Sequence, residues 1–287
     1  MFVAIVILNY NGRAFMERFL PSVYATQYAD AAIFVADNAS SDDSCAFLCE
    51  KEGFVPYVAG AAPVRQGRYL IRLAENYGFA EGYNRALQQI QGAEAFLLLN
   101  SDVEVTPDWL APLVERLQSN ENIAAVQPKI CAEARREWLE HAGAAGGWLD
   151  KWGYPFCRGR IFDECERDEG QYDEAAEIFW ASGAAMLVRA DVFLRFGGFD
   201  GGFFAHMEEI DFCWRIKRAG WAVWCEPKSV VYHVGGGTLP KTNPRKTFLN
   251  FRNNLLMIAK NVDGLWVFYL IWLRLVLDGL AGLRFLA

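Results

Sequence analysis

Apolar runs of strand length alternate with helical patterns through the first part of this chain. Residues 3–8, 33–36 and 95–99 are continuous apolar runs, which is typical of strands that are covered on both faces. Because strands that alternate with helices are joined by right-handed crossovers, the pattern predicts a parallel sheet. We therefore expect an α/β fold with a Rossmann-like, mainly parallel central sheet, flanking helices and C-terminal helices.

The second half of the chain has a less regular pattern. Thr106 and Pro107 form a helix start, with Thr106 as N-cap. From residue 131 to residue 177 we expect long loops with short strands, including an acidic run from residue 163 to residue 177. The other expected elements are a strand at 179–188, a helix at 208–219, short strands at 222–225 and 229–233, and helices at roughly 246–260 and 265–286.

Composition excludes several classes of protein. The net charge of −7 argues against a nucleic-acid-binding protein, because such proteins are usually basic. The seven cysteines contain no CxxC pair, which argues against a zinc module, and their scattered positions fit a reducing compartment. The apolar N-terminus is short and lacks a basic leader, so we interpret it as a strand and not as a signal peptide.

Asp37 follows the second expected strand. A carboxylate there can accept the N3–H of uracil or thymine. Since cytosine has no proton at N3, this contact would select uridine or thymidine nucleotides. The alternative is an Asx-turn, in which Asp37 and Asn38 only lead the chain into the next helix.

Residues 75–85 form a glycine-rich turn that enters a helix. Such a turn suits the approach of a phosphate or ribose to the helix N-terminus. It has neither the Gly-Lys-Ser/Thr ending of a Walker loop nor a GxGxxG pattern. The alternative is a tight strand-to-helix turn with Asn84 pointing inward.

Asn100, Ser101 and Asp102 directly follow the strand at 95–99. An aspartate at the carboxyl end of a buried strand lies where open α/β sheets bind their ligands, and it can coordinate a hard divalent cation. His233 lies just past another expected strand, beside the glycines at 235–237, from where it could reach a metal or a diphosphate. The alternatives are a turn or cap acid for Asp102 and an ordinary core or surface histidine for His233.

Three carboxylates begin the helix expected at 208–219. Asp211 and Arg215 are four residues apart and should pair, so we interpret Asp211 as structural. Glu208 or Glu209 is then available as a general base, and aromatic neighbours suggest a raised pKa. The alternative is a solvated acidic first turn, which the helix dipole favours.

The order of these clusters resembles the inverting family 2 glycosyltransferases with the glycosyltransferase-A fold, especially the bacterial rhamnosyltransferase-like branch. The resemblance extends over roughly residues 1–254, and the ordered set of motifs is more specific than any one of them. The matching motifs are VILNYN at 6–11, DNAS at 37–40, NYGFAEGYN at 76–84, LLNSD at 98–102, GAAML at 183–187, GFD at 198–200, EEID at 208–211 and HVGG at 233–236.

The resemblance implies a nucleotide site. Asp37 would bind the uracil or thymine base, and Asn9 and Asn11 would line the nucleotide pocket. Asn76 would lie close to the ribose and diphosphate. Asn100 would also belong to the nucleotide site; it stands where many family members have the first aspartate of the metal triplet.

The resemblance also implies a metal and a base. Asp102 matches the last acid of the metal triplet, and His233 matches the histidine that often completes the metal shell, so the cofactor would be Mn²⁺ or Mg²⁺. Glu209 matches the catalytic base, with Glu208 beside it, although many members have Glu-Asp where this chain has Glu-Glu. A divalent ion would stabilise the leaving diphosphate while the carboxylate takes the proton of the acceptor hydroxyl.

We therefore expect a catalytic domain at 1–245, with a nucleotide-binding half at 1–105 and an acceptor-binding half at 106–245, and a C-terminal helical segment at 246–287. The apolar stretch 264–278 suits a helix at a membrane surface, although a helix packed on the domain is the alternative.

The expected activity is transfer of a sugar from a UDP- or dTDP-sugar to a glycan or lipid-linked saccharide in cell-surface polysaccharide synthesis. The expected location is the cytoplasm, at the inner face of the cytoplasmic membrane. The alternatives are a sugar-phosphate nucleotidyltransferase and a non-catalytic carbohydrate-binding protein.

Overall fold

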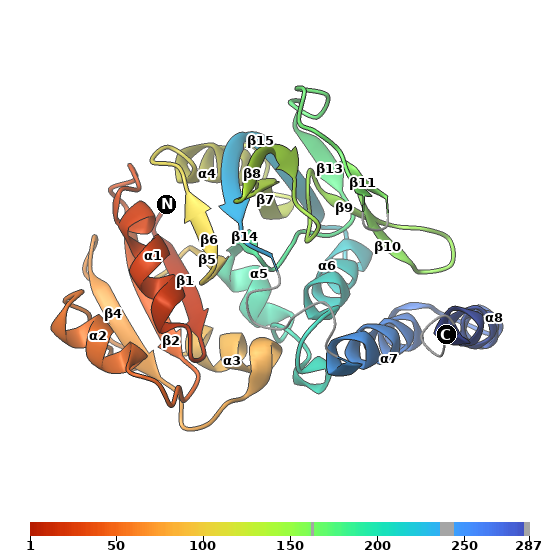
Figure 1. The fold of residues 1–287 in the computed structure, drawn as a ribbon, viewed down its shortest axis with the longest axis horizontal. Coiled ribbons are helices and arrows are strands. Elements are labelled where there is room, and N and C mark those ends of the chain that lie inside the picture. Colours follow the sequence, from red (N-terminus) through yellow and green to blue (C-terminus); the bar gives the residue numbers. More distant parts are fainter. Residues whose placement is uncertain (162–163, 236–243, 284–287) are drawn as a thin grey trace.

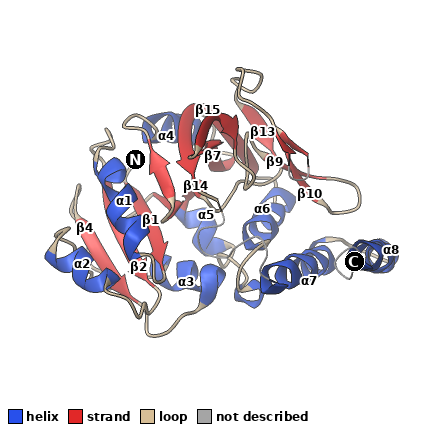
Figure 2. Ribbon diagram, in the orientation of Figure 1, coloured by secondary structure: helices blue, strands red, loops and turns tan. Residues whose placement is uncertain are grey.

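The computed structural model describes residues 1–161, 164–235 and 244–283, and within these residues its centre is a sheet of eleven strands flanked by helices (Figures 1 and 2). One side of the sheet is parallel throughout, as expected. In order across the sheet it consists of β3 (Val55–Pro56), β4 (Arg68–Arg72), β2 (Ala31–Asp37), β1 (Val3–Asn9) and β5 (Ala95–Asn100). Each of these strands therefore ends at the same edge of the sheet.

Beyond β5 the sheet is mixed. β14 (Ala185–Arg189) runs antiparallel between β5 and β7 (Ile123–Ala132), and β15 (Ala222–His233) runs parallel to β7. The strands β6 (Val103–Val105), β8 (Arg135–Leu139) and β13 (Ala176–Ile178) pair antiparallel with their neighbours. A separate small sheet has the order β12 (Glu164–Cys165), β11 (Arg160–Ile161), β10 (Pro155–Cys157) and β9 (Gly147–Leu149).

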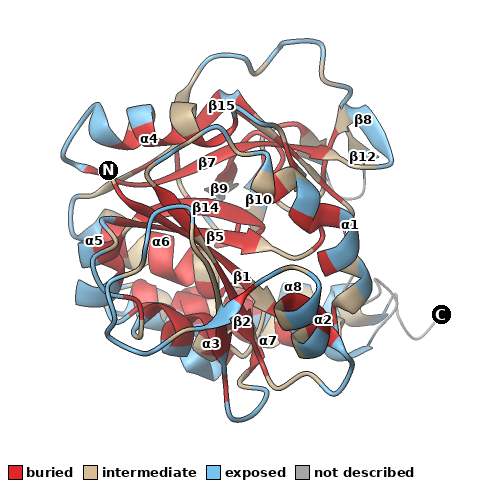
Figure 3. Cartoon of the chain, turned by 90° about the vertical axis from the view of Figure 1, so that its left-hand side faces the viewer, coloured by how far each residue is buried: buried red, intermediate tan, exposed pale blue. Residues whose placement is uncertain are grey.

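An apolar cluster on each face of the central sheet holds the layers together. Successive residues of β1 point to opposite faces, as in any strand. Val6 packs in the cluster that includes α3 (Gly78–Leu87) and α6 (Glu208–Arg218), whereas Ile5 and Ile7 pack with α1 (Arg13–Tyr24) and α4 (Leu110–Gln118). Figure 3 shows the buried strands between helices whose outer surfaces are exposed. The shorter helices are α2 (Ser44–Glu50), α5 (Ala190–Arg195) and the 3-10 turn η1 (Gly201–Phe203).

Two long helices end the described chain. α7 (Pro244–Asn261) packs against α6, and α8 (Trp266–Leu283) follows at the periphery of the molecule (Figure 1). The expected C-terminal end at residue 286, the glycines at 236–237 and the start of the acidic run at residue 163 lie outside the described residues.

Three local expectations were wrong. Thr106 does not cap α4, which begins at Leu110; the Thr106 hydroxyl bonds to the carbonyl of Val230 (3.4 Å) instead. The strand expected at 179–188 is confined to β14, because the chain turns at Ser182. The backbone N–H of Ser182 donates to Oε1 of Gln127 (2.9 Å), and its Oγ accepts from the N–H of Ala184 (3.2 Å). The two strands expected between residues 222 and 233 are one strand, β15, with a register shift between Glu226 and Val230.

Candidate active site

Polar side chains gather at the carboxyl ends of β1, β2 and β5. In the parallel register Asn9 lies opposite Asp37, and Asn100 lies opposite Leu8. The sheet therefore brings Asn9, Asp37 and Asn100 together from three distant parts of the chain. This edge is where open α/β sheets bind their ligands.

Asn9 and Asp37 form a buried polar pair. Nδ2 of Asn9 donates to Oδ1 of Asp37 (3.0 Å) and to Oγ of Ser40 (3.2 Å), and the backbone N–H of Ser40 donates to Oδ2 of Asp37 (3.0 Å). Asp37 thus closes the turn after β2, as the Asx-turn alternative anticipated. Oδ1 of Asn9 is buried and has no hydrogen-bond partner in the described part of the chain. A buried acceptor of this kind is stabilised when a ligand donates to it.

Asn11 joins the loops that follow β1 and β2. It has a positive φ of 52°, and its Oδ1 accepts from the backbone N–H of Ser41 (2.7 Å) and of Asp42 (3.2 Å). Gly12 is required beside it, because a Cβ there would lie 2.4 Å from Oδ1 of Asn9. Asn11 is exposed, at the same edge of the sheet as Asn9.

Asn38 orders the turn into α3, a role that the sequence reasoning missed. Its Nδ2 donates to Oδ1 of Asn76 (3.1 Å) and to the carbonyl of Gly78 (2.9 Å), and its Oδ1 accepts from the N–H of Tyr77 (3.0 Å). Asn76 is thereby fixed at the same edge as Asp37. Asn38 belongs to the DNAS motif, but the partners of its side chain come from a different part of the chain, residues 76–78.

The N-terminus of α3 is occupied by the protein itself. The backbone N–H groups of Phe79 (2.8 Å) and Ala80 (3.2 Å) donate to the carbonyl of Phe204. Asn84 is buried; its Nδ2 donates to the carbonyl of Phe199 (2.7 Å), and its Oδ1 accepts from the N–H of Phe199 (2.9 Å). The structure therefore supports the alternative, a tight strand-to-helix turn with Asn84 pointing inward, over an open phosphate site at this helix.

His233 lies between two buried carboxylates. Its Nε2 is 3.2 Å from Oδ1 of Asp102, and its Nδ1 is 3.0 Å from Oε2 of Glu140. Burial lowers the pKa of His233, but the hydrogen bonds and negative charges of Asp102 and Glu140 outweigh it and raise the pKa to about 10. The same interaction holds the pKa of Glu140 below its usual range, against the effect of burial. Asp102 and His233 were expected to be neighbours; Glu140, in a stretch expected to form loops, was missed.

This arrangement fits a divalent ion that also binds substrate. The described residues hold no group of three or more His, Cys, Asp or Glu side chains arranged to bind a metal by themselves. Asp102 offers a carboxylate oxygen, and Nε2 of His233 would become a ligand once the ion displaces its proton. Glu140 accepts from the other ring nitrogen, an orientation that metal-binding histidines usually require. A protein site with few ligands is typical of a metal that is completed by substrate phosphates and water.

Glu208 and Glu209 begin α6. Glu209 lies beside Gly183, and the next residue, Ala184, accepts from the N–H of Asn100 (2.9 Å) at the end of β5. Glu208 is buried and Glu209 is half-buried, and Oε2 of each has no hydrogen-bond partner among the described residues. Burial, together with the charge of Glu209, raises the pKa of Glu208 well above its usual value. Burial raises the pKa of Glu209 to about 7. The first turn is therefore not a solvated acidic cap, and a carboxylate with a pKa near neutrality suits a general base.

Asp211 is a structural residue, as expected. Its Oδ2 accepts from Nε of Arg215 (2.8 Å) and from Nζ of Lys260 (3.0 Å), and its Oδ1 accepts from Nδ2 of Asn261 (2.8 Å). The pairing with Arg215 follows from their spacing on one helix. The partners Lys260 and Asn261 come from α7 and join it to α6.

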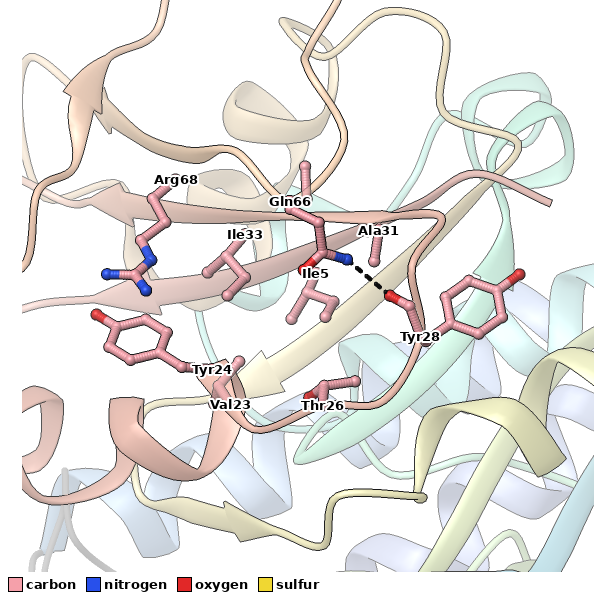
Figure 4. A pocket seen from close by; sticks show the side chains of 10 residues that line it. Ile5, Val23, Tyr24, Thr26, Tyr28, Ala31, Ile33, Gln66 and Arg68 are labelled. Carbon is pink, nitrogen blue, oxygen red and sulfur yellow. Dashed lines mark hydrogen bonds between the residues drawn. The ribbon is translucent and has the colours of Figure 1, made fainter.

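The cavity drawn in Figure 4 is lined by none of the candidate site residues described above. It has a volume of about 50 Å³ and lies among Ile5, Ala31, Ile33, Tyr24 and Arg68. Its strand residues lie away from the carboxyl ends, and Arg68 is already stacked on the ring of Tyr24. The cavity therefore takes no part in the candidate site.

The central sheet, with polar side chains gathered at the carboxyl ends of its parallel strands, has the glycosyltransferase-A fold. The chain belongs to the family described as glycosyl transferase family 2, whose model matches residues 4–194. Both the α/β fold and the enzyme class expected from the sequence are therefore confirmed.

Individual relatives agree with this assignment. The chain is 22% identical over 285 residues to the N-acetylglucosaminyl-diphospho-decaprenol L-rhamnosyltransferase of Mycobacterium tuberculosis, a match that covers 93% of this chain and 87% of the relative. A mannosyltransferase, PcManGT of Pyrobaculum calidifontis, in complex with GDP-Man and Mn²⁺, is similar with a TM-score of 0.62 and 16% identity over 98% of this chain and 75% of that one. GalNAc-T7 with UDP, GalNAc and Mn²⁺ is similar with a TM-score of 0.65 and 16% identity, over 90% of this chain but only 48% of that one.

Proposed function

We propose that this glycosyltransferase inverts the anomeric centre and transfers a sugar from a UDP- or dTDP-sugar to a hydroxyl of a glycan or lipid-linked saccharide. The observation that carries the proposal is the pair of glutamates at the start of α6, each with a buried Oε2 that has no hydrogen-bond partner in the described structure. In the reaction, the acceptor oxygen forms a bond to the anomeric carbon as its proton passes to a carboxylate. The bond between that carbon and the diphosphate oxygen breaks, and its electron pair leaves with the nucleoside diphosphate. No glycosyl-enzyme intermediate is needed.

Asn9 and Asp37 are proposed to select the nucleotide base. Asp37 is an acceptor, and Oδ1 of Asn9 is a second acceptor without a partner of its own in the described structure. Uracil and thymine carry an N3–H donor, whereas cytosine does not. Asn11, Asn76 and Asn100 are proposed to border the same nucleotide.

Asp102 and His233 are proposed to hold a divalent ion, Mn²⁺ or Mg²⁺, with Glu140 orienting the histidine ring. When bound, such an ion neutralises the charge that develops on the departing diphosphate. The Mn²⁺ in the two structural neighbours supports this choice of cofactor.

Glu209 is proposed as the general base. Its pKa of about 7 leaves a substantial fraction ionised at neutral pH, so that it can accept a proton. The pKa of Glu208 is raised further by the neighbouring charge of Glu209, which makes Glu208 the less available acceptor. Glu208 is proposed to orient the acceptor.

α8 is proposed to lie on the cytoplasmic face of the membrane, next to a lipid-linked acceptor. Trp266–Leu283 is long and apolar enough to cross a bilayer by length and composition, with a mean hydropathy of 1.6, and most of it is exposed. However, Arg274 is buried, stacks on the ring of Tyr154 at 3.5 Å and pairs with Asp278 (3.2 Å), and Tyr154 donates to Asp278 (2.8 Å). This polar contact fastens one side of α8 to the domain, which suits a helix lying in the membrane surface better than one that crosses it.

The test is a donor panel of UDP-, dTDP-, GDP- and CDP-sugars, assayed with lipid-linked saccharide extracted from membranes. We expect release of UDP or dTDP with transfer of the sugar and inversion at C1, read by NMR of the product. A nucleotidyltransferase would instead make nucleotide-sugar and pyrophosphate from a sugar phosphate and a nucleoside triphosphate. Absence of release with all donors would favour a carbohydrate-binding protein.

A further inference from the structure

The loop that leads into α6 has a strained backbone. Phe204, His206 and Met207 have positive φ angles of 63°, 70° and 74°. This left-handed conformation is unfavourable for residues that carry a Cβ. Since none of the three residues is glycine, contacts from outside the loop must hold it. Glu208 and Glu209 follow immediately, so the loop determines where α6 begins and where its first side chains point.

The buried side chain of Asn253, from α7, hydrogen-bonds to several backbone carbonyls of this loop. Nδ2 of Asn253 donates to the carbonyl oxygens of Phe203 (2.9 Å), Ala205 (2.8 Å) and His206 (2.7 Å). An amide nitrogen carries two hydrogens, so one of them is shared between two carbonyls. Three carbonyls from such a short segment converge on one point only when the loop adopts this conformation.

The orientation of the Asn253 amide is fixed as well. Its Oδ1 accepts from Nε of Arg252 (2.8 Å), and turning the amide over would place that oxygen against three carbonyl oxygens. On the opposite side, α3 bonds to the one remaining carbonyl between Phe203 and His206, that of Phe204. The loop is therefore held from two sides. From α7, Nη2 of Arg252 donates to the carbonyls of Gly202 (3.0 Å) and Phe203 (3.2 Å), whereas the bonds to the carbonyls of Ala205 and His206, the nearest to α6, come from Asn253.

We propose that Asn253 is a positioning residue for the catalytic base. It holds residues 203–206 in the strained conformation from which α6 begins, and it thereby places the carboxylate of Glu209 against the acceptor hydroxyl without touching substrate. This inference rests on the proposed function of Glu209 as the base.

The test combines Asn253→Ala with Glu209→Gln in a double-mutant cycle. We expect Asn253→Ala to lower kcat by about 10²-fold, the size of effect that a small misplacement of a catalytic group produces. The KM for the donor should stay unchanged, because the nucleotide site lies on β1 and β2. In the Glu209→Gln background the same change should cost less than about twofold, because the group that it positions is already gone. Turnover is expressed per nucleotide-binding site, so that unfolded protein does not count.

Two further variants separate positioning from folding. Asn253→Ser keeps one donor and should retain more turnover than Asn253→Ala, whereas Asn253→Asp, which sets a carboxylate against the carbonyls, should retain less.

Arg189→Ala is a matched control. Arg189 also bonds to three backbone carbonyls, those of Leu117 (2.7 Å), Asn120 (3.3 Å) and Ile123 (2.7 Å), but at the far end of β14. It should lower the melting temperature and leave kcat per site unchanged.

The outcomes distinguish the inference from the proposed function. Equal losses of kcat from Asn253→Ala in both backgrounds, or a parallel loss of donor affinity, would overturn the positioning role. Full turnover by Glu209→Gln itself would instead overturn the choice of Glu209 as base.

Discussion

Nε2 of His233, the last residue of β15, lies 3.2 Å from Oδ1 of Asp102, in the turn between β5 and β6. Two segments that are distant in sequence thus bring one ring nitrogen and one carboxylate oxygen close together. Glu140 holds the far side of the ring, at 3.0 Å from Nδ1, and so fixes which nitrogen faces Asp102.

Replacing Asp102 should remove the divalent ion. We expect Asp102→Ala to lose transfer by at least about 10³-fold, because a metal at a leaving diphosphate supplies several kcal/mol. Chelator should abolish activity of the parent and have no effect on the variant. Initial rates with and without added Mn²⁺ measure this, and a parent that keeps full activity in chelator would contradict the metal site.

Glu140→Gln should weaken metal affinity while leaving the ligands in place. Loss of an oriented partner of a metal-binding histidine typically costs about 10- to 100-fold in affinity or activity. Activity titrated against Mn²⁺ should therefore show a higher half-saturation point and recover at high metal. An unchanged titration would mean that Glu140 acts only in folding.

Asp37→Ala should weaken binding of UDP and dTDP. One hydrogen bond to a charged group contributes about 1.5–3 kcal/mol, which corresponds to about 10- to 150-fold in affinity. Calorimetric titration of the diphosphates measures the loss, and CDP should bind weakly to the parent and be unaffected by the change. Equal affinity of the parent for CDP would refute selection through N3–H.

The sequence predicted the parts of the site that local rules govern. Continuous apolar runs located β1, β2 and β5, and a parallel sheet then requires Asn9 and Asp37 to lie at one edge. The spacing of Asp211 and Arg215 on a helix likewise predicted their pairing. These contacts follow from periodicity and need no knowledge of distant segments.

The parts that were missed depend on contacts between distant segments. Glu140 lies in a stretch without clear periodicity, and nothing near it in sequence indicates that β15 will bring His233 to it. Asn253 looks like any polar residue of a helix, and its bonds to the loop before α6 form only because α7 packs beside that loop. The phosphate site expected at the start of α3 failed for the same reason, because Phe204 occupies it.

Asp211→Asn should act through stability and not through catalysis. The change weakens the interactions with Arg215 and Lys260, and we expect it to lower the free energy of unfolding by about 2 kcal/mol. Urea unfolding measures the loss, and turnover per folded molecule should remain close to that of the parent. A dead but fully stable variant would place Asp211 in the reaction.

Removal of α8, by ending the chain before Gly264, should leave donor hydrolysis intact and lower binding to anionic liposomes. The side chains lost are largely exposed and apolar, including Phe268 and Trp272, so the core loses little. Co-sedimentation with vesicles measures binding. A truncated protein that does not fold would support the packed-helix alternative, and a parent that dimerises in solution through α8 without binding vesicles would contradict the membrane surface.

The glutamates of α6 should give the enzyme a characteristic dependence on pH. A general base acts in its ionised form, so kcat should rise with pH through the pKa of Glu209, about 7. Glu209→Gln should lose about 10²- to 10⁴-fold in kcat with little change in donor affinity, and the rise with pH should disappear. Glu208→Gln should cost less. If Glu208→Gln proves to be the inactive variant, the two roles are exchanged.

Stability should change with pH in the opposite direction. The pKa values of Glu208 and Glu209 are raised in the folded protein, so that between the unfolded value of 4.5 and the folded values the native state binds more protons than the unfolded state. The free energy of unfolding must therefore fall as pH rises through this window. A glutamine at position 208 does not titrate, so Glu208→Gln removes one of the groups that make stability depend on pH. The melting temperature of this variant should therefore fall less between pH 5 and pH 8 than that of the parent. An identical fall in both proteins would show that the pKa of Glu208 is not raised in the folded protein.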